Sequence, residues 1–281
     1  MVTGAATGIG RSIALALAEN GVNVAVADID EDAADVTAAD VEALGVRGIS
    51  CKTDVSQLSD VTRLADEAYS AFGKVDILVN NAGVTMRPFR ASWDTAYEDF
   101  QWMMNVNWWG VLHGFHIFVP RMRSHQGDKH IVSTSSMSSL KPIAGHAAYS
   151  ASKMAVDGFS MAARREFREA KQNIGVSILF PGRVVTRIHT SERLRPVPER
   201  SDERKVTPWI SYLDVPESPD PRRNGRTADK ELGDPIQPDR VGAMVLEGIR
   251  RDVPFILTEP PPVKAIKERA EELMNAYLLD F

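Results

Sequence analysis

A tyrosine and a lysine four residues apart could carry out proton transfer. Tyr149 and Lys153 lie within a predicted helix, where side chains at this spacing are neighbours on one face. A free tyrosine has a pKa near 10, which is too high for a base at neutral pH. A fixed cation beside the phenol favours its ionised form. The pair therefore has the composition of an acid/base group that works near neutral pH.

A cluster of hydroxyl side chains precedes this pair. Residues 133–136 read Ser-Thr-Ser-Ser and end an apolar run, and Ser136 lies 13 residues before Tyr149. A hydroxyl there could hold a substrate oxygen beside the phenol.

A glycine-rich turn lies near the start of the chain, where residues 3–10 read Thr-Gly-Ala-Ala-Thr-Gly-Ile-Gly. Glycines leave no side chain where a backbone must approach a pyrophosphate, and the helix that follows offers free N–H groups. A tight strand-to-helix turn without any ligand is the alternative interpretation. The residues that follow the turn favour the dinucleotide.

Asp28 follows Gly8 by 20 residues, at the end of an apolar run. A carboxylate at this spacing can accept hydrogen bonds from both hydroxyls of an adenosine ribose, and it would repel a 2′-phosphate. Neither the glycine turn nor the residues directly after Asp28 contain an arginine or lysine that would offset this repulsion. The sequence therefore predicts NAD in preference to NADP.

The composition excludes several other classes of protein. The chain has 281 residues, of which 43% are hydrophobic and 25% charged, as in ordinary globular proteins. Its single cysteine, Cys51, excludes an internal disulfide and a cysteine-based zinc site. The net charge of −5 and the absence of long Lys/Arg runs argue against nucleic acid. Without a long apolar segment or a signal-peptide pattern, we expect a cytoplasmic protein that does not bind membranes.

The elements that must position these residues alternate along the chain. Short apolar runs alternate with helical patterns up to about residue 186, which predicts an α/β protein with a doubly wound parallel sheet. We expect strands at residues 22–27, 48–51, 77–80, 130–133, 176–180 and 254–258, and helices at 11–20, 32–44, 59–72, 97–124, 148–172, 238–251 and 262–278. The strand before the glycine turn has room for three residues, so either the native start lies upstream or this strand is frayed.

Residues 187–238 interrupt this alternation. They contain eight prolines together with dense charge, which excludes a long regular element. We expect one dinucleotide-binding domain over residues 1–281, with 187–238 as an insertion that forms a substrate lid. Arg193 and Arg195 within it could bind an anionic group or keep the loop soluble, and the solubility role is the favoured one.

Five ordered motifs over residues 1–186 resemble the short-chain dehydrogenase/reductase family, whose fold is Rossmann-type. They are the glycine turn, Asn-Asn-Ala-Gly at 80–83, Asn-Val-Asn at 105–107, the Ser136, Tyr149 and Lys153 arrangement, and Pro-Gly-Arg-Val-Val-Thr at 181–186. The resemblance implies that Tyr149 is the acid/base, that Ser136 bonds the reacting oxygen, and that Lys153 binds the nicotinamide ribose and lowers the tyrosine pKa. Asn107 would hold a water that links Lys153 to solvent.

The resemblance also implies a set of cofactor contacts. Asp54 and Val55 match positions at the adenine, Asn81 and Ala82 match the adenosine side, and Val184 and Thr186 match positions at the carboxamide. Asp54 could instead cap a helix, and Thr186 could be a turn hydroxyl. The complete set of expected cofactor-binding residues is Gly4, Thr7, Gly8, Ile9, Gly10, Asp28, Asp54, Val55, Asn81, Ala82, Gly83, Tyr149, Lys153, Pro181, Gly182, Val184 and Thr186.

These residues predict reversible hydride transfer between NAD and a secondary alcohol or ketone. An NADPH-dependent 3-oxoacyl or other carbonyl reductase and a non-catalytic dinucleotide-binding sensor are the alternatives. A weaker resemblance to bacterial dehydrogenases of lignin-derived aryl ethers favours benzylic alcohols, and His146 is a candidate substrate contact or a surface histidine. The large apolar residues at 102–104 and 108–109 are expected mainly in the core or at the interface of a homodimer or homotetramer. His113 and His116 lack a third ligand nearby in sequence, so no metal is expected.

Overall fold

Parallel strands form one sheet that places the glycine turn at its centre. The computed structural model describes residues 1–195, 197, 200, 206–213 and 234–277. The seven-stranded sheet has the order β3-β2-β1-β4-β5-β6-β7. The strands are β1 (Val2–Thr3), β2 (Val24–Asp28), β3 (Gly48–Lys52), β4 (Ile77–Asn80), β5 (Lys129–Thr134), β6 (Ile174–Phe180) and β7 (Phe255–Leu257). The strand order reverses between β1 and β4, and in such sheets ligands bind beside the carboxyl ends of the strands at this point.

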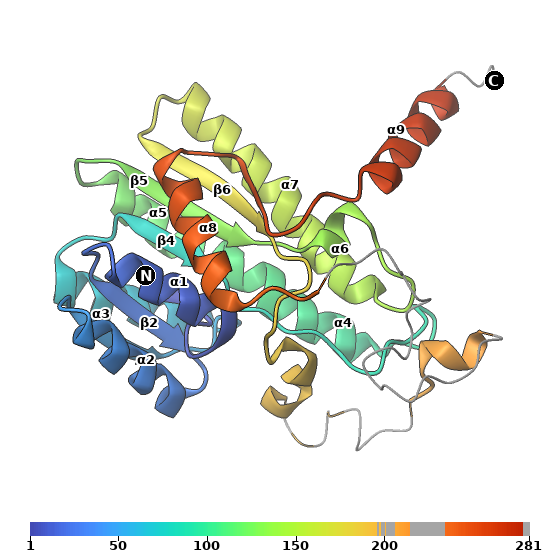
Figure 1. Cartoon of the computed structure of the whole chain (residues 1–281), viewed down its shortest axis with the longest axis horizontal. Coiled ribbons are helices and arrows are strands. Elements are labelled where there is room, and N and C mark those ends of the chain that lie inside the picture. The colour runs from blue at the N-terminus through green and yellow to red at the C-terminus, as the bar shows by residue number, and fades with distance from the viewer. Residues whose placement is uncertain (196, 198–199, 201–205, 214–233, 278–281) are drawn as a thin grey trace.

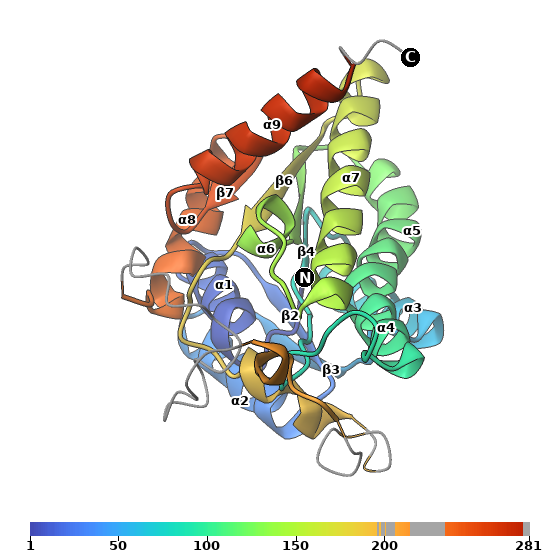
Figure 2. The same ribbon diagram turned by 90° about the vertical axis from the view of Figure 1, so that its right-hand side faces the viewer.

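Helices cover both faces of the sheet, because neighbouring strand residues point to opposite faces. In β2, Val24 and Val26 pack under one group of helices and Ala25 and Ala27 under another. The first group is α1 (Gly8–Ala18), α2 (Glu31–Ala43) and α8 (Pro238–Arg250), and the second is α3 (Leu58–Phe72), α5 (Gly110–Arg123) and α7 (Ala147–Glu169). Figures 1 and 2 show the two layers, with α1 and α8 on one side and α5 and α7 on the other. The predicted doubly wound Rossmann-type fold is confirmed.

The single helix predicted over residues 97–124 is wrong in one respect. The segment consists of α4 (Tyr97–Met104), a π-helical turn η1 (Asn105–Trp109) and α5. Within η1, the buried Asn107 bonds the backbone of Val84 with both ends of its amide. A π turn widens the helix by one residue and is frequent at functional sites.

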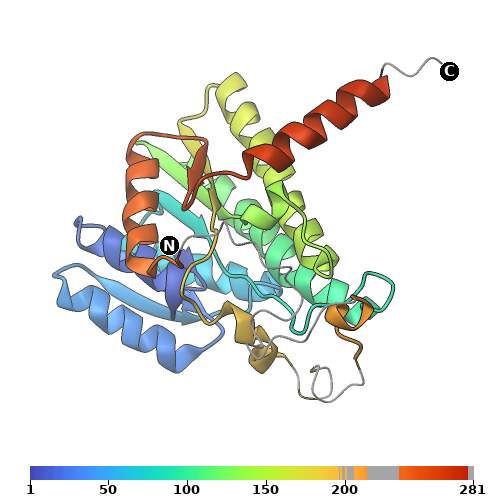
Figure 3. The same ribbon diagram turned by 45° about the vertical axis from the view of Figure 1, so that its right-hand side comes forward.

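The predicted insertion at 187–238 falls partly on residues 196, 198–199, 201–205 and 214–233, which lie outside the described residues. Its described parts contain two short 3₁₀ helices, η2 (Ile188–Leu194) and η4 (Trp209–Tyr212). The prolines permit these short turns while excluding a long element. A short α6 (Met137–Leu140) follows β5, and α9 (Val263–Tyr277) projects away from the sheet (Figure 3). In the described part of the chain no helix has the length and apolar character that crossing a membrane requires.

Candidate active site

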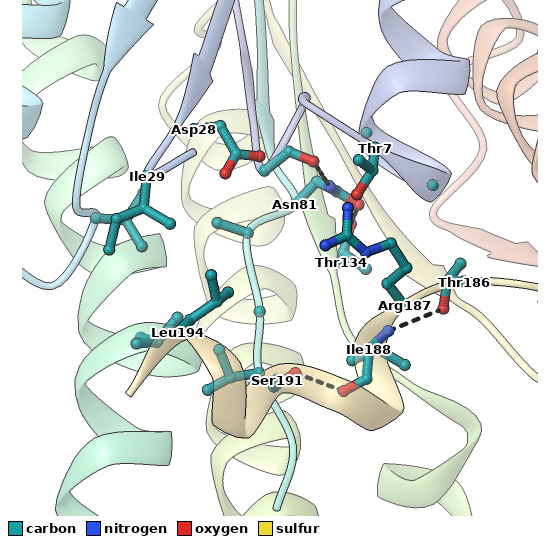
Figure 4. Close-up of a pocket in the computed structure, with 18 of the residues that line it drawn as sticks. Thr7, Asp28, Ile29, Asn81, Thr134, Thr186, Arg187, Ile188, Ser191 and Leu194 are labelled. Atoms are coloured by element: carbon teal, nitrogen blue, oxygen red, sulfur yellow. Dashed lines mark hydrogen bonds between the residues drawn. The ribbon is translucent and has the colours of Figure 1, made fainter. Parts of the chain in front are cut away.

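A cavity of about 800 Å³ lies at the carboxyl ends of the central strands. The glycine turn, the ends of β2, β4, β5 and β6, helix α7 and the segment around η2 all contribute to its lining (Figure 4). Every residue that the sequence predicted as a cofactor contact lines this cavity, and Ser136 does so as well. The cavity therefore unites predicted contacts from Gly4 to Thr186, which are 182 positions apart in the sequence.

The glycine turn is shaped to approach a ligand with its backbone. A Cβ atom on Gly10 would lie 2.1 Å from the carbonyl oxygen of Gly4, so that position admits no side chain. Gly4 and Gly8 have φ values of 63° and 58°, in the left-handed region that glycine adopts most readily. Thr7, at the start of α1, makes no side-chain hydrogen bond to the first turn of that helix. The turn and the helix start therefore form a suitable cradle for a phosphate anion.

Asp28 joins the end of β2 to this cradle. One carboxylate oxygen accepts a hydrogen bond from the Ala6 N–H at 2.9 Å, and the other accepts from the Asp30 N–H at 3.1 Å. Burial raises the pKa of Asp28, and these backbone N–H groups partly oppose the increase. Each carboxylate oxygen can accept a further hydrogen bond. The geometry is compatible with the predicted bond to a ribose.

Tyr149, Lys153 and Ser136 converge on the cavity from α7 and the end of β5. The Lys153 ammonium lies 5.7 Å from the centre of the Tyr149 ring and donates to the Thr134 carbonyl at 2.9 Å. Ser136 begins α6, where its hydroxyl accepts a hydrogen bond from the Ser138 N–H at 3.1 Å. The three side chains lie at one cavity, as expected from the sequence, because the end of β5 and the start of α7 meet there.

Burial shifts the pKa values of Tyr149 and Lys153 in opposite directions. It raises the pKa of Tyr149, whereas a hydrogen bond with Ser136 and the charge of Arg87 lower that pKa. Burial lowers the pKa of Lys153 to about 8, and the nearby Asp157 carboxylate opposes this decrease. Desolvation disfavours the charged form of each group, which explains the two directions. The phenol therefore requires stabilisation of its negative charge before it can act as a base.

Asn107 lies beside the cavity rather than in its lining. Its amide nitrogen donates to the Ser152 hydroxyl at 2.9 Å, and its oxygen accepts from the Val84 N–H at 2.8 Å. A Cβ atom on Gly83 would lie 3.3 Å from this oxygen and 3.3 Å from Lys153 Nζ. Asn107 Oδ1 and Lys153 Nζ therefore both lie close to Gly83. This arrangement is compatible with the predicted water between Asn107 and Lys153.

His146 lies beside Tyr149 and outside the cavity lining. Its ring stacks on that of Tyr149, with centroids 4.5 Å apart, and contacts Phe89 on its other side at 4.4 Å. Its Nε2 lies 2.6 Å from the Thr85 hydroxyl. The alternative of a surface histidine is wrong, because His146 is buried. A direct substrate contact stays a prediction, and the geometry favours support of the Tyr149 ring.

The predicted cofactor contacts also have structural partners of their own. Asn81 donates to the carbonyls of Thr3 and Gly4 at 3.0 and 3.2 Å, which ties β4 to the glycine turn. Asp54 accepts from the Ser56 N–H, whereas α3 begins after Gln57, so Asp54 does not cap that helix. Thr186 accepts from the Ile188 N–H at 3.5 Å. Thr186 therefore forms the turn that the sequence offered as an alternative role while it also lines the cavity.

The sequence predicted a substrate lid after Thr186 but not that its first residues line the same cavity as the glycine turn. Arg187, Arg193 and Arg195 line the cavity. Arg195 is fully buried, donates to Asp99 at 2.6 Å and lies over the Trp102 ring at 4.7 Å. The solubility role is therefore wrong for Arg195. Trp102 packs against a small core cluster, as expected, and also lines the cavity; its position one helical turn before Val106 of the Asn-Val-Asn motif could have indicated this second role.

The predicted absence of a metal concerns the histidines of α5. His113 lies 2.9 Å from the Val55 carbonyl through its Nδ1 atom. Among the residues that the structure describes, no group of three potential ligands forms a metal site.

The comparisons with known proteins decide the family. The family model described as short chain dehydrogenase matches residues 1–196. The chain belongs to the short-chain dehydrogenase/reductase family. This short-chain dehydrogenase is similar to the putative oxidoreductase SadH of Mycobacterium tuberculosis, with 35% identity over 189 residues that cover 67% of each chain.

Solved structures of the family extend the likeness over the whole chain. A short-chain dehydrogenase from Burkholderia phymatum in complex with NAD has 32% identity and a TM-score of 0.85, and the match covers 98% of this chain and 93% of that one. The apo form of LigO from Sphingobium sp. strain SYK-6 has 27% identity and a TM-score of 0.74, with coverages of 99% and 87%. The oxidoreductase class and the nucleotide-binding fold predicted from the sequence are confirmed.

Proposed function

We propose that this protein transfers a hydride reversibly between NAD and a secondary alcohol or its ketone. The observation that carries the proposal is the convergence of Ser136, Tyr149 and Lys153 on the cavity lined by the glycine turn. Bound NAD supplies the hydride chemistry. The residues of this chain supply orientation and proton transfer.

Each catalytic side chain has a separate task. Ser136 donates its hydroxyl to the substrate oxygen and fixes it near the phenol. Tyr149 takes the hydroxyl proton during oxidation and returns it during reduction. The Lys153 charge stabilises the phenolate, and the pKa of about 8 that burial imposes on it leaves this ammonium largely charged at neutral pH. Asn107 is the proposed water-holding residue between Lys153 and solvent.

We infer a preference for NAD over NADP from Asp28. Its partly buried carboxylate faces the cavity and would repel a 2′-phosphate. The similar Burkholderia phymatum protein was solved with NAD, which supports the same preference.

The substrate proposal is an aromatic, benzylic alcohol. It rests on the sequence resemblance to bacterial dehydrogenases of lignin-derived aryl ethers, and on the exposed aromatic edge of Trp93, Trp209 and Tyr212. Trp209 packs closely on Gly145, the neighbour of His146, so this edge lies near the Tyr149 end of the site. An aromatic ring could stack there on approach.

The test is a screen of NAD reduction across steroid, sugar, acyl and benzylic alcohols, with NADP in parallel. We expect turnover with NAD and the highest kcat/KM for benzylic alcohols. Faster reduction of a 3-oxoacyl substrate with NADPH would favour the carbonyl-reductase alternative. Tight NADH binding without turnover of any substrate would favour the sensor.

We also propose that copies of this chain associate through α5 and α7. Trp109 and Met161, near the two helices, are 44% and 50% exposed, which leaves apolar surface for a partner. Sedimentation analysis should give a dimer or tetramer, whereas a monomer at micromolar concentration would contradict this proposal.

A further inference from the structure

Two arginines of the segment after β6 face the cavity opposite the glycine turn. Arg187 and Arg193 both line the cavity. The base of their segment lies against the turn, because a Cβ atom on Gly8 would be 3.2 Å from Thr186 Cγ2. Figure 4 shows the Arg187 guanidinium pointing back from this segment toward Thr7. The Arg187 cation is therefore presented to the space in front of the α1 N-terminus, and Arg193, whose charge interacts with Asp30 and Asp28 after β2, lines the same cavity.

Backbone contacts fix the Arg193 guanidinium beside the first residues of its segment. Arg193 Nη1 donates to the Thr190 carbonyl at 3.1 Å and to the Arg187 carbonyl at 3.3 Å, which fixes the guanidinium within the η2 turn. Burial, followed by the charge of Arg187, lowers the pKa of Arg193, while Asp30 and Asp28 oppose this decrease. Like charges that are held in one cavity repel each other unless an anion lies between or beside them.

Arg11 shows a different arrangement at the same helix. It is the first basic residue after the glycine turn, and its guanidinium pairs with Asp40 at 2.6 Å. Arg11 also does not belong to the cavity lining, whereas Arg187 and Arg193 do. The guanidinium groups that could bind a ligand phosphate at the glycine turn therefore come from the segment after Thr186.

We propose that Arg187 and Arg193 bind the pyrophosphate of the dinucleotide on the side opposite the glycine turn. This inference rests on the proposed function, since it assigns ligands to the same cofactor. The N–H groups of the α1 start contact one side of the diphosphate, and the guanidiniums contact the other through charge-assisted hydrogen bonds. These contacts also hold residues 187–195 over the cofactor.

The test compares ligands that contain and lack phosphate. Dissociation constants for NADH, ADP and adenosine are measured by calorimetry with the full chain, its Arg187→Ala and Arg193→Ala variants and the double variant. Because a hydrogen bond to a charged group contributes strongly to binding, each single substitution should weaken the binding of NADH and of ADP about tenfold or more. Adenosine binding should not change, and the salt dependence of NADH binding should decrease. Arg187→Lys should recover part of the loss.

The matched control is Arg251→Ala, which removes an exposed arginine paired with Glu247 at the end of α8. It should leave all three dissociation constants unchanged. Melting temperatures report whether each variant folds.

Three outcomes would overturn the inference. An unchanged NADH affinity in the double variant would show that the proposed contacts do not form. An equal loss for adenosine assigns the arginines a structural role. A loss for NADH without a loss for ADP places the arginines away from the diphosphate. If the unaltered chain binds neither NADH nor ADP, the proposed function fails, and this result is distinct from the other three.

Discussion

Replacing Asp99 with asparagine should destabilise the protein far more than replacing an exposed aspartate in an ion pair. Asp99 is fully buried, and its two carboxylate oxygens each accept a guanidinium hydrogen bond, one from Arg90 and one from Arg195. Both arginines are also almost completely buried. An asparagine has nearly the same shape but carries no charge, so the substitution leaves two buried guanidiniums without the carboxylate that they share.

The magnitude follows from burial and from a neighbouring acid. Breaking a buried ion pair by removing one partner costs about 3–5 kcal/mol. Glu192 lies 3.7 Å from Arg195 and 3.9 Å from Arg90, and it compensates part of the lost charge. We therefore expect the free energy of unfolding to decrease by about 3 kcal/mol, the lower end of this range. For a chain of this size, this corresponds to a decrease in melting temperature of about 6 °C or more.

Urea denaturation and thermal melting measure this effect, with Asp40→Asn as the control. Asp40 lies 2.6 Å from Arg11, the same distance as Asp99 from Arg195, but the exposed fractions of its pair are 41% and 42%. Exposed pairs contribute at most about 1 kcal/mol. Equal, small losses in the two variants would refute the reasoning that burial determines the value of this pair.

Three further predictions concern cofactor choice, stability and positioning. Asp28→Ser should reduce the NAD to NADP affinity ratio at least about tenfold, since it removes the carboxylate that repels a 2′-phosphate; an unchanged ratio in binding titrations would contradict this. Burial lowers the pKa of His130 from 6.5 to about 4. Between these two pH values the unfolded chain binds one more proton than the folded chain, so the protein loses stability as the pH is lowered through this window. The loss is about 3 kcal/mol at 1.36 kcal/mol per pKa unit, and urea denaturation at pH 7 and 4.5 should show a smaller loss for His130→Gln than for the unaltered chain. Gly83→Ala places a Cβ atom 3.3 Å from both Asn107 Oδ1 and Lys153 Nζ, so kcat should fall about tenfold; unchanged turnover would show that the spacing is not critical.

The sequence predicts the sheet and most of the cavity because both depend on local patterns. The apolar run at 77–80 becomes β4 at the same residues, and α1 begins at Gly8 within the glycine turn, three residues before its predicted start. Parallel strands then bring their carboxyl ends together regardless of the distance along the chain. The residues proposed as cofactor contacts, all of which line the cavity, could therefore be predicted from motifs alone.

The rest depends on partners that no local pattern specifies. Asp99 and Arg195 are 96 residues apart, and only the folded chain shows that they form a buried pair. The π turn at Asn107 inserts into an otherwise regular helical pattern, so periodicity predicts one long helix there. His146 follows a loop, and its stacking on Tyr149 depends on the tertiary position of Phe89.

The central claim is that Tyr149 carries the proton in an NAD-dependent oxidation of a secondary alcohol. The most direct measurement uses a benzylic alcohol deuterated at its carbinol carbon and follows deuterium into NADH by mass spectrometry, for the unaltered chain and for Tyr149→Phe. We predict transfer by the unaltered chain, and its loss in Tyr149→Phe while NADH affinity stays within about twofold, since the phenylalanine ring keeps the shape but cannot hold the proton. Substantial deuterium transfer by Tyr149→Phe would contradict the account.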